Sequence, residues 1–61
     1  MEFTLSEGVW EYWFKDKETG KPLTPIKSLG VLMLNETKVF IDVPQDIEDN
    51  KQAVIFIQRT R

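Results

Sequence analysis

Apolar residues in this chain occur in short runs separated by turn-forming residues. Gly8–Lys15 is rich in β-branched and aromatic side chains, and Lys38–Val43 alternates apolar and polar positions with a period of two. Val31–Leu34 and Ala53–Arg59 are two further apolar runs of strand length. Because no segment of about ten residues or more repeats its apolar positions with a helical period, the pattern predicts strands rather than helices.

Turn signals between these runs predict how the strands connect. Asp16–Gly20 predicts a hairpin loop whose glycine takes a left-handed conformation. Residues 21–26 contain two prolines, so they form an edge strand or a loop rather than a central strand. Asn35–Thr37 is a tight-loop signal, which predicts that Val31–Leu34 and Lys38–Val43 pair as an antiparallel hairpin.

Three further segments leave alternatives open. Ser28–Gly30 indicates a bend or a bulge, and Phe3–Ser6 is either a short first strand or a packed terminal arm. The polar segment 45–51 is either a loop or one short helical turn. We therefore expect residues 1–61 to form one small all-β domain, an antiparallel meander or an SH3-like or OB-like barrel of four to five short strands.

The alternation of strand faces leaves more apolar surface than one core can use. Two large aromatic side chains, Trp13 and Phe40, fall on the outer faces of their strands. Val31–Leu34 and Ala53–Arg59 are apolar on both faces, whereas a sheet with one wet face alternates cleanly. The surplus is covered either by closure of a barrel or by a second chain, a copy of itself or another protein. The alternation assigns these residues to the core: Trp10, Tyr12, Phe14, Val39, Ile41 and Val43.

Size makes such a domain marginally stable by itself. Burial of apolar surface in a chain of 61 residues contributes on the order of 95 kcal/mol, and ordering the chain costs roughly 92 kcal/mol. The two terms nearly cancel, and binding of a second chain to the folded form adds stability. We therefore expect self-association, with a homodimer as the simplest form.

Composition excludes several classes of function. The chain has no Cys and no His, which excludes disulfides and nucleophiles activated by histidine, and no metal or cofactor is expected. Its net charge of −2 has the opposite sign to the basic excess of a duplex-binding domain. The apolar runs are too short to span a bilayer, and the first residues lack the pattern of a signal peptide. A cytoplasmic protein without membrane contact is expected.

Candidate binding residues are the outward aromatic side chains and the basic residues near them. Aromatic residues and arginine are the usual anchors of protein interfaces. Four acidic residues that lie close together at positions 42–49 lack the spacing of a calcium loop, and they are expected to steer a basic partner. No cleft is expected that could exclude water, so an enzyme is not expected. The predicted partner-binding residues are Trp13, Lys15, Lys38, Phe40 and Arg59, and the predicted steering acids are Asp42, Asp46, Glu48 and Asp49.

These observations favour a noncatalytic protein-interaction module, an inhibitor or assembly subunit that acts through an exposed apolar and aromatic face. A small chain without cysteine, with little net charge and with surplus apolar surface also resembles the small inhibitor proteins encoded by bacteriophages, a resemblance that involves no motif. The alternative is a single-stranded nucleic-acid binder of OB or SH3-like type, because such barrels stack bases on exposed aromatic side chains beside Lys and Arg.

Overall fold

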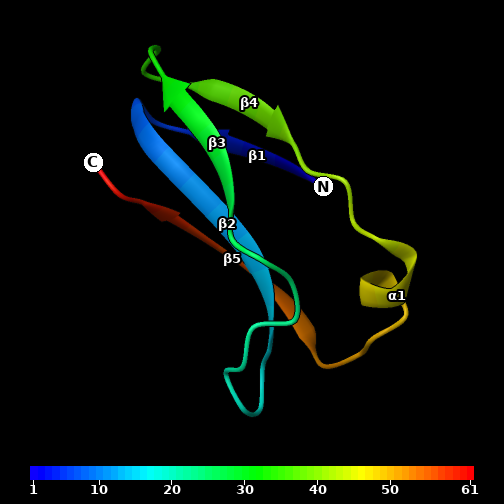
Figure 1. The fold of residues 1–61 in the computed structure, drawn as a ribbon. Coiled ribbons are helices and arrows are strands. Elements are labelled where there is room, and N and C mark those ends of the chain that lie inside the picture. The colour runs from blue at the N-terminus through cyan, green and yellow to red at the C-terminus, as the bar shows by residue number, and fades with distance from the viewer.

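The computed structural model describes residues 1–61 as five strands and one helical turn (Figure 1). The prediction of a small, mostly β domain with antiparallel strands is confirmed. Of the alternatives left open, the N-terminal segment forms a strand and the polar segment 45–51 contains a helical turn. No helix in the fold is long and apolar enough to cross a membrane. The elements are β1 (Glu2–Leu5), β2 (Gly8–Asp16), β3 (Lys27–Leu32), β4 (Thr37–Phe40), α1 (Gln45–Glu48) and β5 (Ala53–Arg59).

The strands form two open sheets and do not close into a barrel. One sheet has the order β3-β2-β5, and the other is the two-stranded ribbon β1-β4. The predicted hairpin between Val31–Leu34 and Lys38–Val43 is therefore wrong, because β3 pairs with β2 and β4 pairs with β1. The physical reason is where the strand ends. β3 stops at Leu32 and residues 33–36 leave the sheet, so β4 does not fold back onto the free edge of β3 and pairs with β1 instead.

The connection from β2 to β3 follows the predicted turn chemistry. The Asp16 Oδ1 atom accepts hydrogen bonds from the backbone N–H groups of Glu18, at 2.8 Å, and Thr19, at 3.1 Å. Gly20 closes the turn at a φ of 75°, which confirms its predicted left-handed conformation. Residues 21–26 form a loop with a single bridge, from Pro22 to Lys15. The predicted bulge at Ser28–Gly30 is also confirmed, since the register of β3 shifts there.

The core lies between the two sheets and is thinly covered. Phe14 from β2, Ile41 after β4 and Ile47 from α1 meet in it, with Tyr12 half-buried beside them. The predicted core face of β2 is therefore confirmed for Tyr12 and Phe14, whereas Trp10 does not pack against this cluster and donates its indole N–H to the Ser6 carbonyl at 2.9 Å. Only 4 of the 61 residues are buried, and the chain exposes 4588 Å², against about 4,100 Å² for a typical folded chain of this mass. The 29 backbone–backbone hydrogen bonds also fall short of the roughly 40 expected.

Candidate functional site

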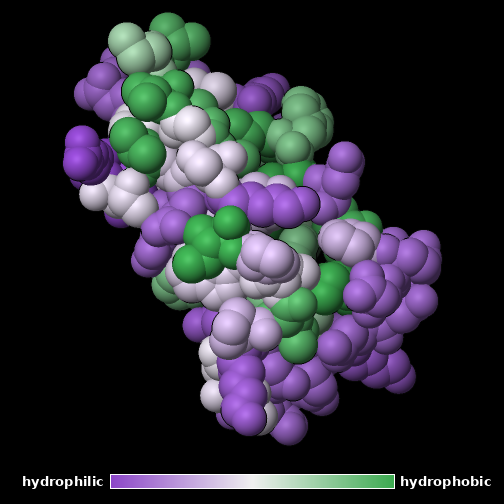
Figure 2. Space-filling model, viewed as in Figure 1, coloured by the Kyte–Doolittle hydropathy of each residue, from purple (hydrophilic) through white to green (hydrophobic).

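The most exposed apolar side chains gather where β3 ends and the chain turns toward β4. Val31, Met33 and Leu34 are 63%, 80% and 66% exposed. Leu32 is half-buried opposite Gly8, and beyond it the chain leaves the sheet, so Met33 and Leu34 enter solvent. Figure 2 shows hydrophobic atoms collected over this part of the molecule, while the opposite end is mostly hydrophilic. We call these three residues the apolar end.

A further exposed apolar side chain, Phe40, lies at the far end of β4. It is 74% exposed, because Val39 and Ile41 on either side of it take the inward positions. Lys38 is exposed two residues earlier on the same outer face, and the two residues lie opposite Thr4 and Glu2 of β1. The ribbon therefore presents an aromatic ring with a cation beside it, as the sequence predicted for these two positions.

A second surface lies on the outer face of the three-stranded sheet. The rings of Trp13 and Phe56, which face each other across β2 and β5, have centroids 4.8 Å apart and planes inclined by 42°. The Lys15 Nζ atom lies 4.3 Å from the centroid of the Phe56 ring, a cation–π arrangement. Beside them the Gln58 Nε2 group donates to the Glu11 carboxylate at 2.8 Å. We call Trp13, Lys15 and Phe56 the aromatic cluster.

Arg59 lies on the other face of the same sheet. It stands opposite Trp10, three positions from the Trp13 and Phe56 pair, so its side chain projects to the core side. Its Nη1 group makes only a long hydrogen bond of 3.4 Å to the Glu7 carbonyl. The structure thus places the five predicted partner-binding residues on three different surfaces.

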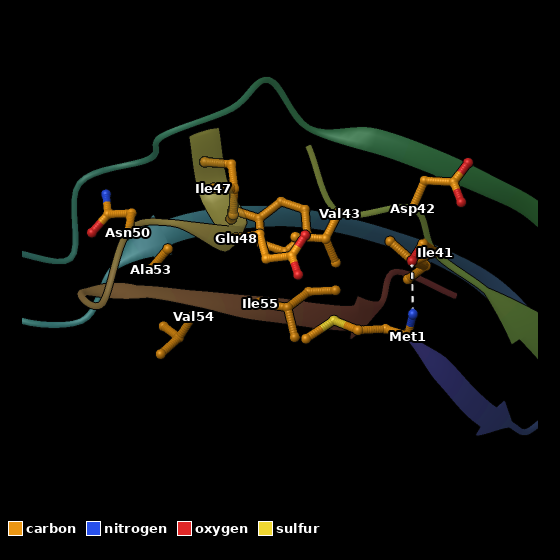
Figure 3. Close-up of a pocket in the computed structure, with 11 residues that line it drawn as sticks. Met1, Ile41, Asp42, Val43, Ile47, Glu48, Asn50, Ala53, Val54 and Ile55 are labelled. Atoms are coloured by element: carbon orange, nitrogen blue, oxygen red, sulfur yellow. Dashed lines mark hydrogen bonds between the residues drawn. The ribbon is translucent and has the colours of Figure 1, made fainter. Parts of the chain in front are cut away.

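The inner side of the three-stranded sheet opens into a pocket of about 820 Å³ near α1 (Figure 3). Two of the predicted steering acids, Asp42 and Glu48, line it, whereas Asp46 is exposed and outside it. The Asp49 carboxylate accepts a hydrogen bond from the Gln45 side chain at 3.1 Å. No three acidic side chains converge closely enough to hold a metal ion. The main apolar lining comes from Phe14, Ile41, Val43, Ile47, Ala53 and Ile55.

Sequence reasoning included neither Phe56 nor the pocket in a site. The signal for Phe56 was present, because Ala53–Arg59 is apolar on both faces, but the pattern alone did not show which face is outside. The pocket depends on Ile47 of α1 meeting Ile55 of β5, which no local pattern reveals.

Comparison with known proteins identifies no relative: no protein-family model, no curated protein and no solved structure matches the chain.

Proposed function

We propose that this protein is a noncatalytic interaction module that binds another protein through the apolar end and Phe40. The observation that carries this proposal is the exposure of Val31, Met33, Leu34 and Phe40, each more than 60% open to solvent in a chain of 61 residues. Soluble proteins seldom leave so much apolar surface uncovered unless a partner binds there.

Phe40 has the properties of an interface anchor. Its ring is large, and the next residue, Ile41, is only 2% exposed, so the backbone that presents the ring is held in place before binding. Lys38 lies beside it on the same face. A partner with an apolar recess and an acidic rim complements this pair. Of the predicted steering acids, only Asp42 is close to Phe40 in the chain, since Asp46, Glu48 and Asp49 belong to α1 or its end.

The alternative function, binding of single-stranded nucleic acid, is less well supported. Base stacking needs free ring faces. In the aromatic cluster one face of Phe56 is occupied by the Lys15 ammonium group, and its ring is also packed against Trp13. Phe40 keeps a free ring beside Lys38, but it is a single exposed ring, and the net charge of −2 does not favour a phosphate backbone. We therefore propose a protein-binding function.

Site-specific photo-crosslinking tests this proposal in the cells that make the protein. A photoreactive phenylalanine replaces Leu34 in one variant and Phe40 in another, both exposed positions. A third variant carries it at Glu18, in the polar turn after β2. We expect one and the same protein to be crosslinked from positions 34 and 40 and not from 18. Introducing Met33→Asp into the first two variants should abolish both adducts, because the charge cannot be buried in an apolar interface.

Equal crosslinking from all three positions, or none from 34 and 40, would contradict a specific partner surface. Because all four substituted positions are exposed, loss of folding does not complicate the result, and circular dichroism of each purified variant verifies this.

A further inference from the structure

The outer edge of β5 has unpaired backbone groups. β5 is the last strand of its sheet. The N–H of Thr60 donates to Val9 at 2.7 Å, and the carbonyl of Gln52 accepts from Lys17 at 2.8 Å. Since antiparallel partners alternate between hydrogen-bonded and non-hydrogen-bonded pairs, the even-numbered residues of β5 point their backbone groups toward β2. The N–H and C=O groups of Ile55, Ile57 and Arg59 therefore point outward.

This edge lacks the features that normally prevent strands from pairing between molecules. Natural edge strands are protected by bulges, prolines or charged side chains. The opposite edge, β3, begins at Lys27 and contains the bulge near Gly30. The ribbon carries Glu2 and Lys38 within its short strands. In contrast, the first six residues of β5, Ala53–Gln58, contain no charge, no proline and no glycine.

The pocket lies along the same edge and indicates what the added strand should contain. Ala53 and Ile55 of β5 form one of its walls. Its charged groups are the carboxylates of Asp42 and Glu48 and the terminal ammonium group of Met1, which donates to the Ile41 carbonyl at 3.1 Å, and no Lys or Arg side chain lines it. In Figure 3 the Glu48 carboxylate projects into the space between α1 and β5, while Asp42 points away from it. An extended segment with apolar residues at alternate positions and a cation at its end complements this wall.

β5 itself has that pattern, with Ile55, Ile57 and Arg59 at alternate positions. We propose that a second copy of this chain pairs its β5 antiparallel to the free edge of β5, so that one six-stranded sheet runs through a symmetric dimer. In a dimer with a two-fold axis both copies use the same surface, so β5 of one copy pairs with β5 of the other. Two-fold symmetry is the commonest arrangement in homodimers. This interface is separate from the apolar end, so it stands or fails independently of the proposed function.

A register centred on Phe56 pairs the outward backbone groups and also places an apolar side chain in the pocket. Phe56 faces Phe56 of the second copy on the axis, Ile55 faces Ile57, and Ala53 faces Arg59. The outward groups of Ile55, Ile57 and Arg59 then all have partners. Opposite residues project from the same face of a sheet, so Ile57 of the second copy enters the pocket. Arg59 of the second copy lies beside Ala53 at the end of this wall, and its long side chain extends along β5 toward the Glu48 carboxylate, which lies near Ile55, the next inward residue (Figure 3).

The excess of exposed area indicates the size of the proposed interface. The chain exposes 4588 Å², roughly 470 Å² more than is typical for its mass. Two copies that lost this excess would bury roughly 900 Å² in total, which is below the range of stable interfaces, about 1,200–2,000 Å², so the proposed interface is a small one. Arg59 is also available, because in the single chain its guanidinium group has only the long contact with the Glu7 carbonyl.

Backbone N-methylation tests the strand pairing directly in the full chain, which is short enough for chemical synthesis. A methyl group on the Ile57 nitrogen removes one outward donor and blocks the edge without disturbing the bonds to β2. The matched control is methylation of Val31, whose N–H points outward on the β3 edge by the same alternation. Sedimentation equilibrium should give about twice the chain mass of 7.2 kDa for the unmodified protein and the control. The Ile57 derivative should be a monomer with an unchanged circular dichroism spectrum.

Two results would overturn the proposal: a monomeric unmodified protein across the micromolar range, or an Ile57 derivative that dimerises as strongly as the unmodified protein. A charge exchange then tests the register. Arg59→Glu and Glu48→Lys should each raise the dimer dissociation constant about tenfold or more, and the double variant should recover most of the loss. Asp46→Lys, on the same helix but outside the pocket, is the control and should have little effect. Failure of the double variant to recover would contradict the proposed register.

Discussion

The rings of Trp13 and Phe56 contact each other across the β2–β5 pair in a tilted arrangement, with centroids 4.8 Å apart and planes inclined by 42°. The alternation of the sequence places Trp13 outside, where its removal would be expected to leave the fold largely intact. The structure changes this expectation, because Trp13 is half-buried against a cross-strand aromatic partner. Cross-strand pairs of this kind hold strands in register.

We predict that Trp13→Ala destabilises the protein and that this effect is coupled to Phe56. Aromatic pairs contribute about 0.5–1.5 kcal/mol beyond the area they bury. A double-mutant cycle with Phe56→Ala, followed by urea denaturation and circular dichroism, should return a coupling free energy in that range. A coupling near zero would mean that the two rings do not stabilise each other.

Phe40 and Ile41 are neighbours in the chain, but one is exposed and the other is buried. Replacing Ile41 should lower the free energy of unfolding far more than replacing Phe40. Ile41 is 2% exposed, whereas Phe40 is 74% exposed. Ile41→Ala leaves a cavity in the core and should cost about 2–5 kcal/mol of unfolding free energy, enough to unfold so small a domain. Phe40→Ala should change the free energy of unfolding by less than about 0.5 kcal/mol.

Circular dichroism melting curves of the two variants provide the measurement. If Phe40→Ala lowered the stability as much as Ile41→Ala does, Phe40 would belong to the core and could not be an interface anchor.

The strands and turns were predictable because their signals are local. The aromatic and β-branched density of Gly8–Lys15 predicted β2, and the Asp16–Gly20 turn follows from side-chain hydrogen bonds within a few residues. The pairing of Val31–Leu34 was not predictable, since the tight-loop signal at Asn35–Thr37 is local while the pairing depends on the long edge of β2. The local pattern of a segment does not show which distant strand it will pair with.

The candidate surfaces were predictable to the extent that they depend on alternation. Trp13 and Phe40 were placed on outer faces by the period of two, and both lie there. Arg59 was grouped with them by composition, but it lies on the core side, because it is an odd number of positions from Phe56 in the same strand. Whether two residues from different strands lie on one surface depends on how the strands pair. The pattern within a single strand does not give that pairing.

Oligonucleotide binding provides a test between the two candidate functions. Because Lys15 and Trp13 pack against the Phe56 ring, we expect no saturable binding of a single-stranded oligonucleotide at low salt, and no quenching of tryptophan fluorescence. Saturable binding that weakens steeply as salt is raised would instead support the nucleic-acid function.

Gly8 should be the least replaceable of the three glycines. Its φ is 135°, a conformation that other residues adopt only at a cost of about 1–3 kcal/mol. A Cβ atom there would also lie 2.6 Å from the Arg59 Cδ atom and 2.6 Å from the Arg61 carbonyl oxygen. The arginine side chain can move aside, but the carbonyl belongs to the backbone that continues β5 beside β2. Gly8→Ala should therefore strain the backbone and also separate the ends of the two strands.

The matched control is Gly20→Ala, which introduces a left-handed residue at a φ of 75° with no atom within 4 Å of the new Cβ. Gly20→Ala should lower the free energy of unfolding only by the cost of a left-handed alanine, about 1–2 kcal/mol. Gly8→Ala should lower it clearly more, as measured by urea denaturation. Adding Arg59→Ala to Gly8→Ala should restore little of the lost stability, because the new Cβ atom would still clash with the Arg61 carbonyl oxygen. If the double variant regained the stability of Arg59→Ala alone, the arginine side chain would be the only obstacle, and the close approach of the backbone at Gly8 would be refuted.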